Sequence, residues 1–282
     1  MNRPHTEFFQ TQMMEWELSG ENSFRPKTNL KILSQDEKSG AQTSIIRYPS
    51  EWCTDNKQYL DFDEEFYILS GDFNINNQKY SEGDYGFLPA GFPRLLLSTS
   101  NGADVLTFFD KSHTIGNIPL DGKKFDKRKL IEKINTKQKQ WGSSTDPTIA
   151  APGIKRLGLR KDPYNSEATW LLSIDPTGMS SDTNKIESHP VVEEMFLISG
   201  EIHMHTGVLR QGAYFWRPPK IVHGPTGSKT GAVGIFRSKG GPLTTEWSEK
   251  SYKVPWNNSY NPILPEEISK KITLKYDNSC KY

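Results

Sequence analysis

The chain has 282 residues, and its 35 Lys and Arg nearly balance its 34 Asp and Glu, giving a formal net charge of +1. A nearly neutral chain has no long-range field to gather phosphate backbones, so nucleic acid is not an expected partner. No stretch approaches 18 apolar residues and no apolar signal region opens the chain, so we expect no membrane span and no secretory leader. Two cysteines make no disulfide framework, which favours a cytoplasmic location.

Short β-prone runs separated by turn signals recur along the chain. Six of them lie at residues 45–46, 66–69, 105–109, 169–172, 195–198 and 234–236. The 22 Gly and 18 Pro supply the turns between such runs. Many short strands at this spacing are typical of a sandwich or barrel rather than of alternating βαβ units, so the predicted class is all-β.

One segment departs from this β pattern. Residues 121–139 carry eight Lys and Arg against three acids. Within them Phe125, Leu130, Ile131 and Ile134 match the apolar stripe of a helix. We therefore predict a short, basic, helical segment between two domains. No aromatic residues are interleaved there for base stacking, which again argues against nucleic acid.

An internal repeat organises the chain. The sequence EEFYILSG at 64–71 returns as EEMFLISG at 193–200, an offset of 129 residues. Further positions match at the same offset, including Gly83 with Gly212 and Tyr85 with Tyr214. Repeats of this kind indicate two copies of one structural unit. We expect domains at 1–145 and 146–250, followed by an extension at 251–282 that packs on them.

The repeat also predicts which strand face points inward. After Gly200, apolar Ile202 and Met204 alternate with polar His203 and His205, and the first copy alternates in the same way. Side chains of a strand alternate between its two faces, so the apolar set should face the core. His203 and His205 are therefore expected on the outer face, in a surface or interface role rather than as metal ligands.

A cluster of metal-ligand residue types stands in the second copy. Glu187, His189 and Glu193 are separated by even numbers of residues, so in one regular strand they share a face. His223 follows a Pro-Pro turn and would come from another strand. Two imidazoles and a carboxylate make the facial triad typical of non-haem Fe(II) sites, with Glu187 as a fourth ligand. Mn(II) and Zn(II) also accept such ligands.

These residues resemble the two motifs of the cupin superfamily, and the whole chain resembles a bicupin: two tandem double-stranded β-helix (jelly-roll) barrels. It resembles the uncharacterised bacterial bicupins that carry an ExHPVVEE segment, here 187–194, and a YFWRPPxxxHGP segment, here 214–225. The resemblance covers roughly residues 1–250. It departs from the usual motifs at Glu187, where a histidine is usual, and at Lys220, where a glycine is usual. It implies one divalent metal per chain, with Fe(II) favoured.

The first copy lacks the same ligands. The matching positions are Gln58, Leu60, Glu64 and Arg94. Leucine binds no metal and arginine only donates, so no metal is expected in the first barrel. Glu64 and Arg94 would instead meet as an ion pair inside it, a guanidinium replacing the cation.

The expected pocket of the second barrel is largely apolar and suits a small organic substrate. Four side chains are predicted to line it: Met195, Met204, Tyr214 and Trp216. The outer faces of the barrels and the extra tail offer surface for a homodimer.

The resemblance implies a metal-dependent enzyme, first of all a non-haem dioxygenase or other oxygenase with its site in the second barrel. Glu187 would be a fourth ligand or a general base. One alternative is a redox-neutral metal enzyme, such as a decarboxylase, isomerase or hydrolase, in which the ion only polarises a carbonyl. Another is a non-enzymatic, metal-stabilised ligand-binding or sensing module, because a fold does not decide function.

Overall fold

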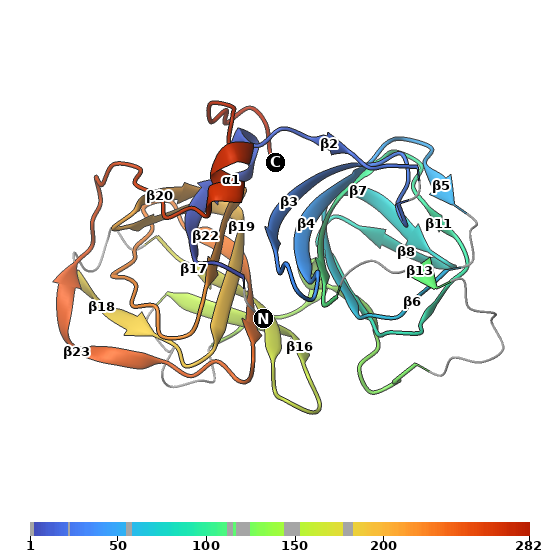
Figure 1. Ribbon diagram of the computed structural model, residues 1–282. Helices are drawn as coiled ribbons and strands as arrows, with labels where there is room; N and C mark the ends of the chain where they lie inside the picture. Colours follow the sequence, from blue (N-terminus) through green and yellow to red (C-terminus); the bar gives the residue numbers. More distant parts are fainter. Residues whose placement is uncertain are drawn as a thin grey trace. The chain divides into compact units, whose positions relative to one another are not determined.

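A computed structural model describes residues 3–21, 23–54, 58–111, 115–116, 125–143, 153–176 and 183–282, and of Gln58, Ile115, Gly116 and Ser143 the backbone alone. These residues form mainly β-strands in two compact units (Figure 1). Their helical elements are short: two 3-10 turns, η1 (Thr11–Met13) and η2 (Thr136–Gln138), and one helix, α1 (Glu266–Lys271). No helix among the described residues is long and apolar enough to cross a membrane.

The first unit comprises Met1–Arg3 and Trp16–Lys139. Its main sheet has the order β14-β9-β7-β12-β4-β3-β2, with bounds β2 (Glu17–Leu18), β3 (Asn29–Gln35), β4 (Gln42–Tyr48), β7 (Glu64–Ile75), β9 (Asp84–Leu88), β12 (Ala103–Phe109) and β14 (Ile131–Asn135). Shorter strands complete the unit: β5 (Cys53–Thr54), β6 (Gln58–Leu60), β8 (Gln78–Ser81), β10 (Pro93–Arg94), β11 (Leu97–Ser98) and β13 (Ile115–Gly116). Aromatic rings such as Phe62, Phe66 and Phe109 fill its interior.

The second unit comprises Pro4–Glu15 and Gln140–Tyr282. Its main sheet has the order β1-β21-β19-β22-β17-β16-β15, and β20 pairs with β19. The bounds are β1 (Thr6–Gln10), β15 (Gly142–Ser143), β16 (Ile154–Lys161), β17 (Ala168–Ile174), β19 (Val192–Met204), β20 (Gly207–Arg210), β21 (Ala213–Arg217) and β22 (Ala232–Lys239). A separate antiparallel pair joins β18 (Thr183–Ser188) to β23 (Glu246–Lys253).

The two units repeat one strand plan. Moved by 129 residues, β8 and β9 of the first unit coincide with β20 and β21 of the second. The repeated sequences 64–71 and 193–200 both end in a glycine, and the structure shows why this position requires glycine. Gly71 has φ +79° and Gly200 has φ +78°, and in each case a Cβ atom would lie 2.0 Å from a backbone carbonyl oxygen. Only glycine fits such a close approach at positive φ.

The N-terminal segment belongs to the second unit, which differs from the expected boundary of the first domain at residues 1–145. β1 pairs antiparallel with β21, placing Thr6 opposite Trp216 and Phe9 opposite Tyr214. Phe8 is fully buried in the core of the second unit. A strand near the N-terminus carries no signal of its distant partner, so the sequence alone could not assign it.

The basic segment is not the helix that its apolar spacing predicts. Residues 121–124 lie outside the described residues, and Ile131–Asn135 form β14, which pairs with β9. Among the residues of this segment that the structure describes, helical geometry is limited to η2. Leu130 packs against the core of the first unit. The apolar residues of the basic segment therefore belong to the edge of a sheet and not to one face of a helix. Tertiary pairing overrides local propensity here.

His203 is covered rather than exposed. His203 is 4% exposed, its ring lies 5.2 Å from that of Trp256, and its backbone bonds with Gly227. Ile202 and Met204 lie in the core of the second unit, as the alternation predicts, while on the other face His205 is exposed and His203 is covered by the extension. The residues after β23 cause this difference because they fold back onto the second unit, where the Tyr260 hydroxyl donates to the Phe8 carbonyl at 3.0 Å.

Candidate metal centre in the second barrel

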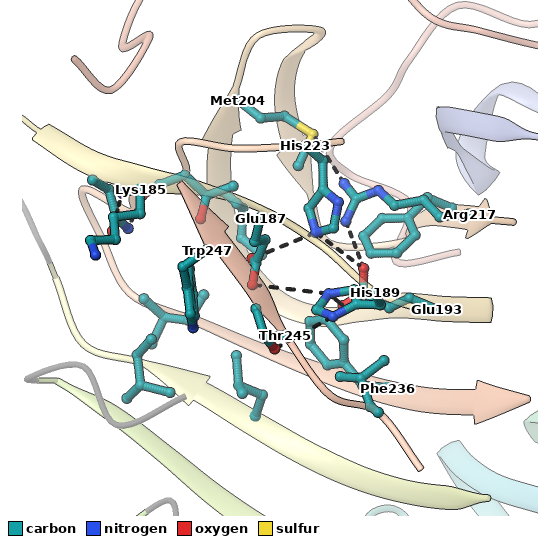
Figure 2. A pocket seen from close by; sticks show the side chains of 18 of the residues that line it. Lys185, Glu187, His189, Glu193, Met204, Arg217, His223, Phe236, Thr245 and Trp247 are labelled. Atoms are coloured by element: carbon teal, nitrogen blue, oxygen red, sulfur yellow. Dashed lines mark hydrogen bonds and ion pairs between the residues drawn. The ribbon is translucent and has the colours of Figure 1, made fainter. Parts of the chain in front are cut away.

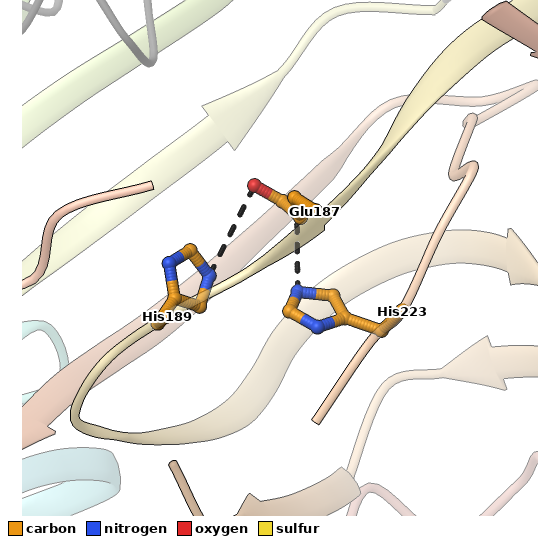
Figure 3. A group of neighbouring side chains, drawn as sticks. All are labelled: Glu187, His189 and His223. Carbon is orange, nitrogen blue, oxygen red and sulfur yellow. Dashed lines mark ion pairs between the residues drawn. The ribbon is translucent and has the colours of Figure 1, made fainter. Parts of the chain in front are cut away.

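Three metal-binding side chains converge beside the end of β18 (Figure 3). Glu187 is the last residue but one of that strand, and His189 follows directly after the strand. His223 comes from the loop after β21, and two backbone hydrogen bonds of 2.9 Å each join it to Glu187. This bridge fixes the two residues side by side although 36 positions separate them in the sequence.

The ligand atoms lie within reach of one ion. One donor atom from each of Glu187, His189 and His223 lies within 4.8 Å of the other two. The Glu187 carboxylate is 3.9 Å from His189 Nε2 and 3.5 Å from His223 Nε2. The two imidazole rings are 5.2 Å apart and tilted by 49°. These separations suit an ion between the three groups, because metal–ligand bonds are about 2.0–2.2 Å long.

Both imidazoles are oriented for coordination. His189 Nδ1 lies 2.9 Å from the Thr244 carbonyl oxygen, and His223 Nδ1 lies 3.0 Å from that of Ile221. A carbonyl oxygen only accepts, so each Nδ1 carries a proton, and the lone pair of each neutral imidazole is then on Nε2. Within the described residues, the buried His223 Nε2 makes no hydrogen bond. Metal-binding histidines show this arrangement, and the residues present therefore fit a divalent cation.

Glu193, the other predicted ligand, lies beside this trio but is already paired. One of its oxygens, Oε1, is 3.8 Å from His189 Nε2, and the other, Oε2, is 3.5 Å from His223 Nε2. Arg217 donates to Oε2 at 2.8 Å. Burial alone would raise the pKa of the Glu193 carboxyl, but the nearby His223, Arg217 and His189 lower it. The group therefore stays ionised.

Arg217 is held by a second carboxylate from the other end of the chain. Its Nε and Nη2 donate to Glu7 at 2.7 and 2.5 Å, and both side chains are almost fully buried. Burial alone would lower the pKa of Arg217, yet Glu7 and Glu193 raise it. Burial alone would raise the pKa of Glu7, yet Arg217 lowers it strongly. Glu7, Arg217 and Glu193 thus form a buried charged chain, which we call the Glu7–Arg217–Glu193 network.

Sequence reasoning missed both Arg217 and Glu7. Arg217 matches Leu88 in the first copy. A charged residue at a position that is apolar in the other copy could have indicated a special role for Arg217. Glu7 gave no such signal, because its role depends on the pairing of β1 with β21.

The centre opens into a cavity of about 510 Å³ between the main sheet and the β18–β23 pair (Figure 2). Glu187, His189, Glu193 and His223 line one part of it, with Arg217 behind them. The rest of its wall is mainly apolar and includes Trp170, Phe215, Phe236 and Trp247. A volume of this size is typical of small-molecule sites.

A family model described as a domain of unknown function (DUF4437) matches residues 9–242. The chain belongs to the DUF4437 family. No curated protein matches the sequence.

Solved structures similar to this DUF4437 protein show its fold. A protein of Nostoc punctiforme described as "a putative dioxygenase" matches with a TM-score of 0.76 at 16% identity, over 89% of this chain and 90% of that one. Bacillus subtilis oxalate decarboxylase, in a study of its Mn(II) centres, matches with a TM-score of 0.55 at 12% identity, over 86% and 79%. YlbA of E. coli matches with a TM-score of 0.59 at 12% identity, over 83% and 90%. The fold is that of two tandem cupin barrels.

The four side chains expected to line the pocket of the DUF4437 protein divide into two groups. Met204 lines the cavity, and Met195 lies in the adjoining core without reaching the cavity wall. Tyr214 and Trp216 project from the opposite face of β21, because the cavity-lining side chains of that strand are Phe215 and Arg217. The Tyr214 hydroxyl instead donates to buried Glu194 at 2.7 Å. Their bulk in both copies reflects packing behind the sheet.

The corresponding site in the first barrel of the DUF4437 protein holds an ion cluster. Arg94 Nε donates to Glu64 at 2.7 Å, confirming the predicted pair, and Arg25 donates to the other carboxylate oxygen at 2.9 Å. Burial would raise the pKa of Glu64, but Arg25 and Arg94 lower it. Leu60 is buried in the aromatic core. Gln58 pairs through its backbone with Arg94, while its side chain lies outside the described residues.

Proposed function

We propose that the second barrel is a metal-dependent oxygenase site that acts on a small organic molecule. The observation that carries this proposal is the convergence of two imidazole Nε2 atoms and one carboxylate at the wall of a largely apolar cavity. Two histidines and one carboxylate with open positions are typical of non-haem Fe(II) oxygenases. The named solved structure with the highest TM-score, 0.76, is also the one described as "a putative dioxygenase".

Charge supports a divalent cation. The carboxylates of Glu7, Glu193 and Glu187 lie in one connected cluster, and within it Arg217 supplies a single guanidinium. With neutral imidazoles this leaves two negative charges. Buried charge without compensation is expensive, and one divalent ion would balance it.

Glu187, His189 and His223 would hold the ion, with Oε1 of Glu193, which Arg217 does not bind, as a further donor beside it. Iron held in this way would supply Lewis acidity toward a substrate oxygen and activation of O2. The side chain of Glu187 is 23% exposed, against 3–8% for the side chains of the other three residues. We therefore assign to the Glu187 oxygen that would not hold the ion the role of accepting a proton from bound substrate.

Oxygen uptake tests the proposal. The protein is loaded anaerobically with Fe(II), Mn(II) or Zn(II), then mixed with O2 and a panel of small organic acids. We expect O2 consumption with Fe(II) only, lost in His223→Ala and kept in His205→Ala, because His205 is exposed and is not one of the three converging ligands. Turnover without O2 consumption in the Mn(II) or Zn(II) protein would contradict the oxygenase and indicate a redox-neutral enzyme. Binding without turnover would indicate a sensor.

A further inference from the structure

The guanidinium of Arg217 lies one carboxylate away from the candidate metal centre. Its Nη1 donates to Glu193 Oε2 at 2.8 Å, and the same oxygen lies 3.5 Å from His223 Nε2. An arginine side chain keeps its positive charge in proteins, and this one is almost fully buried. A cation bound at His223 would therefore have a fixed, poorly screened positive charge near it. Without compensation, this charge would oppose the binding of the ion.

The carboxylate of Glu7 supplies this compensation. Glu7 accepts from Nε and Nη2 of Arg217 at 2.7 and 2.5 Å, while Nη1 is left for Glu193. Two parallel hydrogen bonds between opposite charges also fix the orientation of the guanidinium. His5 Nε2 lies 3.3 Å from one oxygen of the same carboxylate. The pair of Glu7 and Arg217 has no net charge, so the negative charges of Glu187 and Glu193 remain to attract an ion.

The backbone holds Glu7 in place from two sides. On one side β1 pairs with β21, the strand that carries Arg217. On the other side Glu7 exchanges two backbone hydrogen bonds of 2.8 and 2.5 Å with Ile263, a residue of the C-terminal extension. Glu7 and Arg217 are 210 positions apart in the sequence. Both ends of the chain therefore help to place the charge that balances Arg217.

We propose that Glu7 is a positioning residue of the metal centre: it neutralises Arg217 and thereby lets the second barrel hold a divalent ion tightly. Without the charge of Glu7, Glu193 becomes the carboxylate that balances Arg217, and its negative charge no longer serves the ion. Because such coupling is reciprocal, a bound ion should also stabilise the docking of β1. The inference deepens the proposed function and rests on it only for the presence of an ion.

Zn(II) affinity, measured by competition with a chromophoric chelator, tests the inference. We expect Glu7→Gln to weaken Zn(II) binding about tenfold to a hundredfold, the loss that is typical when a residue supporting a metal ligand is changed. Gln10→Ala is the matched control. Gln10 is a buried residue of the same strand and donates to the Val208 carbonyl at 3.2 Å, so its loss affects β1 without changing the charge beside Arg217. Gln10→Ala should bind Zn(II) as the wild type does.

A double variant separates the effect of charge from loss of structure. Glu7→Gln combined with Arg217→Met removes one charge of each sign, so the cluster regains the net charge of the wild type. We expect it to bind Zn(II) at least ten times more tightly than Glu7→Gln alone, whereas a merely structural defect would grow with the second change. Thermal unfolding verifies that each variant is folded during the titration. Hydrogen exchange of the wild type needs no variant: Zn(II) should slow the exchange of the amides of residues 6–10.

Three results would overturn the inference: equal Zn(II) affinity in Glu7→Gln and the wild type, a double variant that binds no more tightly than Glu7→Gln, or exchange in residues 6–10 that Zn(II) leaves unchanged. Its failure is distinguishable from failure of the proposed function. Any of these results together with O2 consumption by the Fe(II) protein would contradict only the role of Glu7. Weakened and rescued Zn(II) binding without O2 consumption would contradict only the oxygenase. A wild type that binds no Zn(II) would contradict both.

Discussion

Arg217 is the residue on which the arrangement of the candidate centre depends. It binds Glu7 and Glu193 at once, and all three side chains are at most 8% exposed. Replacing one partner of a buried charged group leaves the others uncompensated, which costs about 3–5 kcal/mol. We predict that Arg217→Met lowers the unfolding free energy of the second unit by that amount in denaturant titrations. The double variant with Glu7→Gln should lose less than the sum of the two single variants, because the two residues share one interaction. Additive losses would contradict the network.

Glu64 makes the matching prediction for the first barrel. Arg25 and Arg94 hold the pKa of this buried carboxyl below its ordinary value, so the unfolded chain takes up its proton at higher pH than the folded one. The stability that the charge contributes is complete above the unfolded pKa of about 4.3 and is lost as pH falls below it. Glu64→Gln should therefore destabilise the first unit by about 3–5 kcal/mol at pH 7, with a gap that narrows in acid. A gap independent of pH between about 6 and 3 would contradict this.

At the scale of elements, each unit has a glycine of positive φ inside its longest strand, Gly71 in β7 and Gly200 in β19. A Cβ at Gly200 would lie 2.0 Å from the Gly231 carbonyl oxygen, and the residue has φ +78°. We predict that Gly200→Ala destabilises the second unit by about 2 kcal/mol or more, since both the clash and the left-handed backbone disfavour alanine. Gly158 of β16 is the control, because a Cβ there would meet nothing within 4 Å. Equal thermal unfolding of Gly200→Ala and Gly158→Ala would contradict the close approach.

The elements also show which parts of the fold and of the site could be predicted from the sequence. The 129-residue repeat was sufficient to predict two barrels, because both copies keep the same glycine, Gly71 and Gly200, and the same alternation of apolar and polar residues after it. The even spacing of Glu187, His189 and Glu193 predicted one regular strand, and this was wrong: Glu187 lies in β18, His189 follows that strand, and Glu193 lies in β19. The role of Glu7 could not be predicted, because only the pairing of β1 with β21 brings Glu7 next to Arg217. Tyr214 and Trp216 were assigned to the pocket from their bulk, while the strand period puts Phe215 and Arg217 there.

Lys220 shows a local departure that the structure explains. The resemblance predicted a glycine there, and Lys220 adopts the positive φ of 68° that glycine favours. Its backbone N–H donates to the His189 carbonyl at 2.7 Å, which ties the turn after β21 to the centre. The turn thus keeps the backbone conformation that glycine favours although its residue is lysine, and the hydrogen bond to His189 stabilises it.

At the scale of the whole molecule, the two barrels differ in the residues that occupy the corresponding metal-ligand positions. The first fills it with the Glu64, Arg94 and Arg25 cluster, and the second presents paired histidines to a cavity. A bound ion should therefore stabilise only the second unit, by about 2.7 kcal/mol when free metal exceeds its dissociation constant a hundredfold. We predict that a chelator lowers one calorimetric transition and leaves the other unchanged. Equal shifts of both transitions would contradict a single centre.

Metal content is the measurement that tests the central claim most directly. The wild type, His189→Ala and His205→Ala are purified without chelator, reconstituted with Fe(II) in parallel and analysed by inductively coupled plasma mass spectrometry. We predict about one metal ion per chain in the wild type and in His205→Ala, and close to none in His189→Ala. A wild type without metal after reconstitution, or a His189→Ala variant that keeps its full complement, would contradict the centre built from Glu187, His189 and His223.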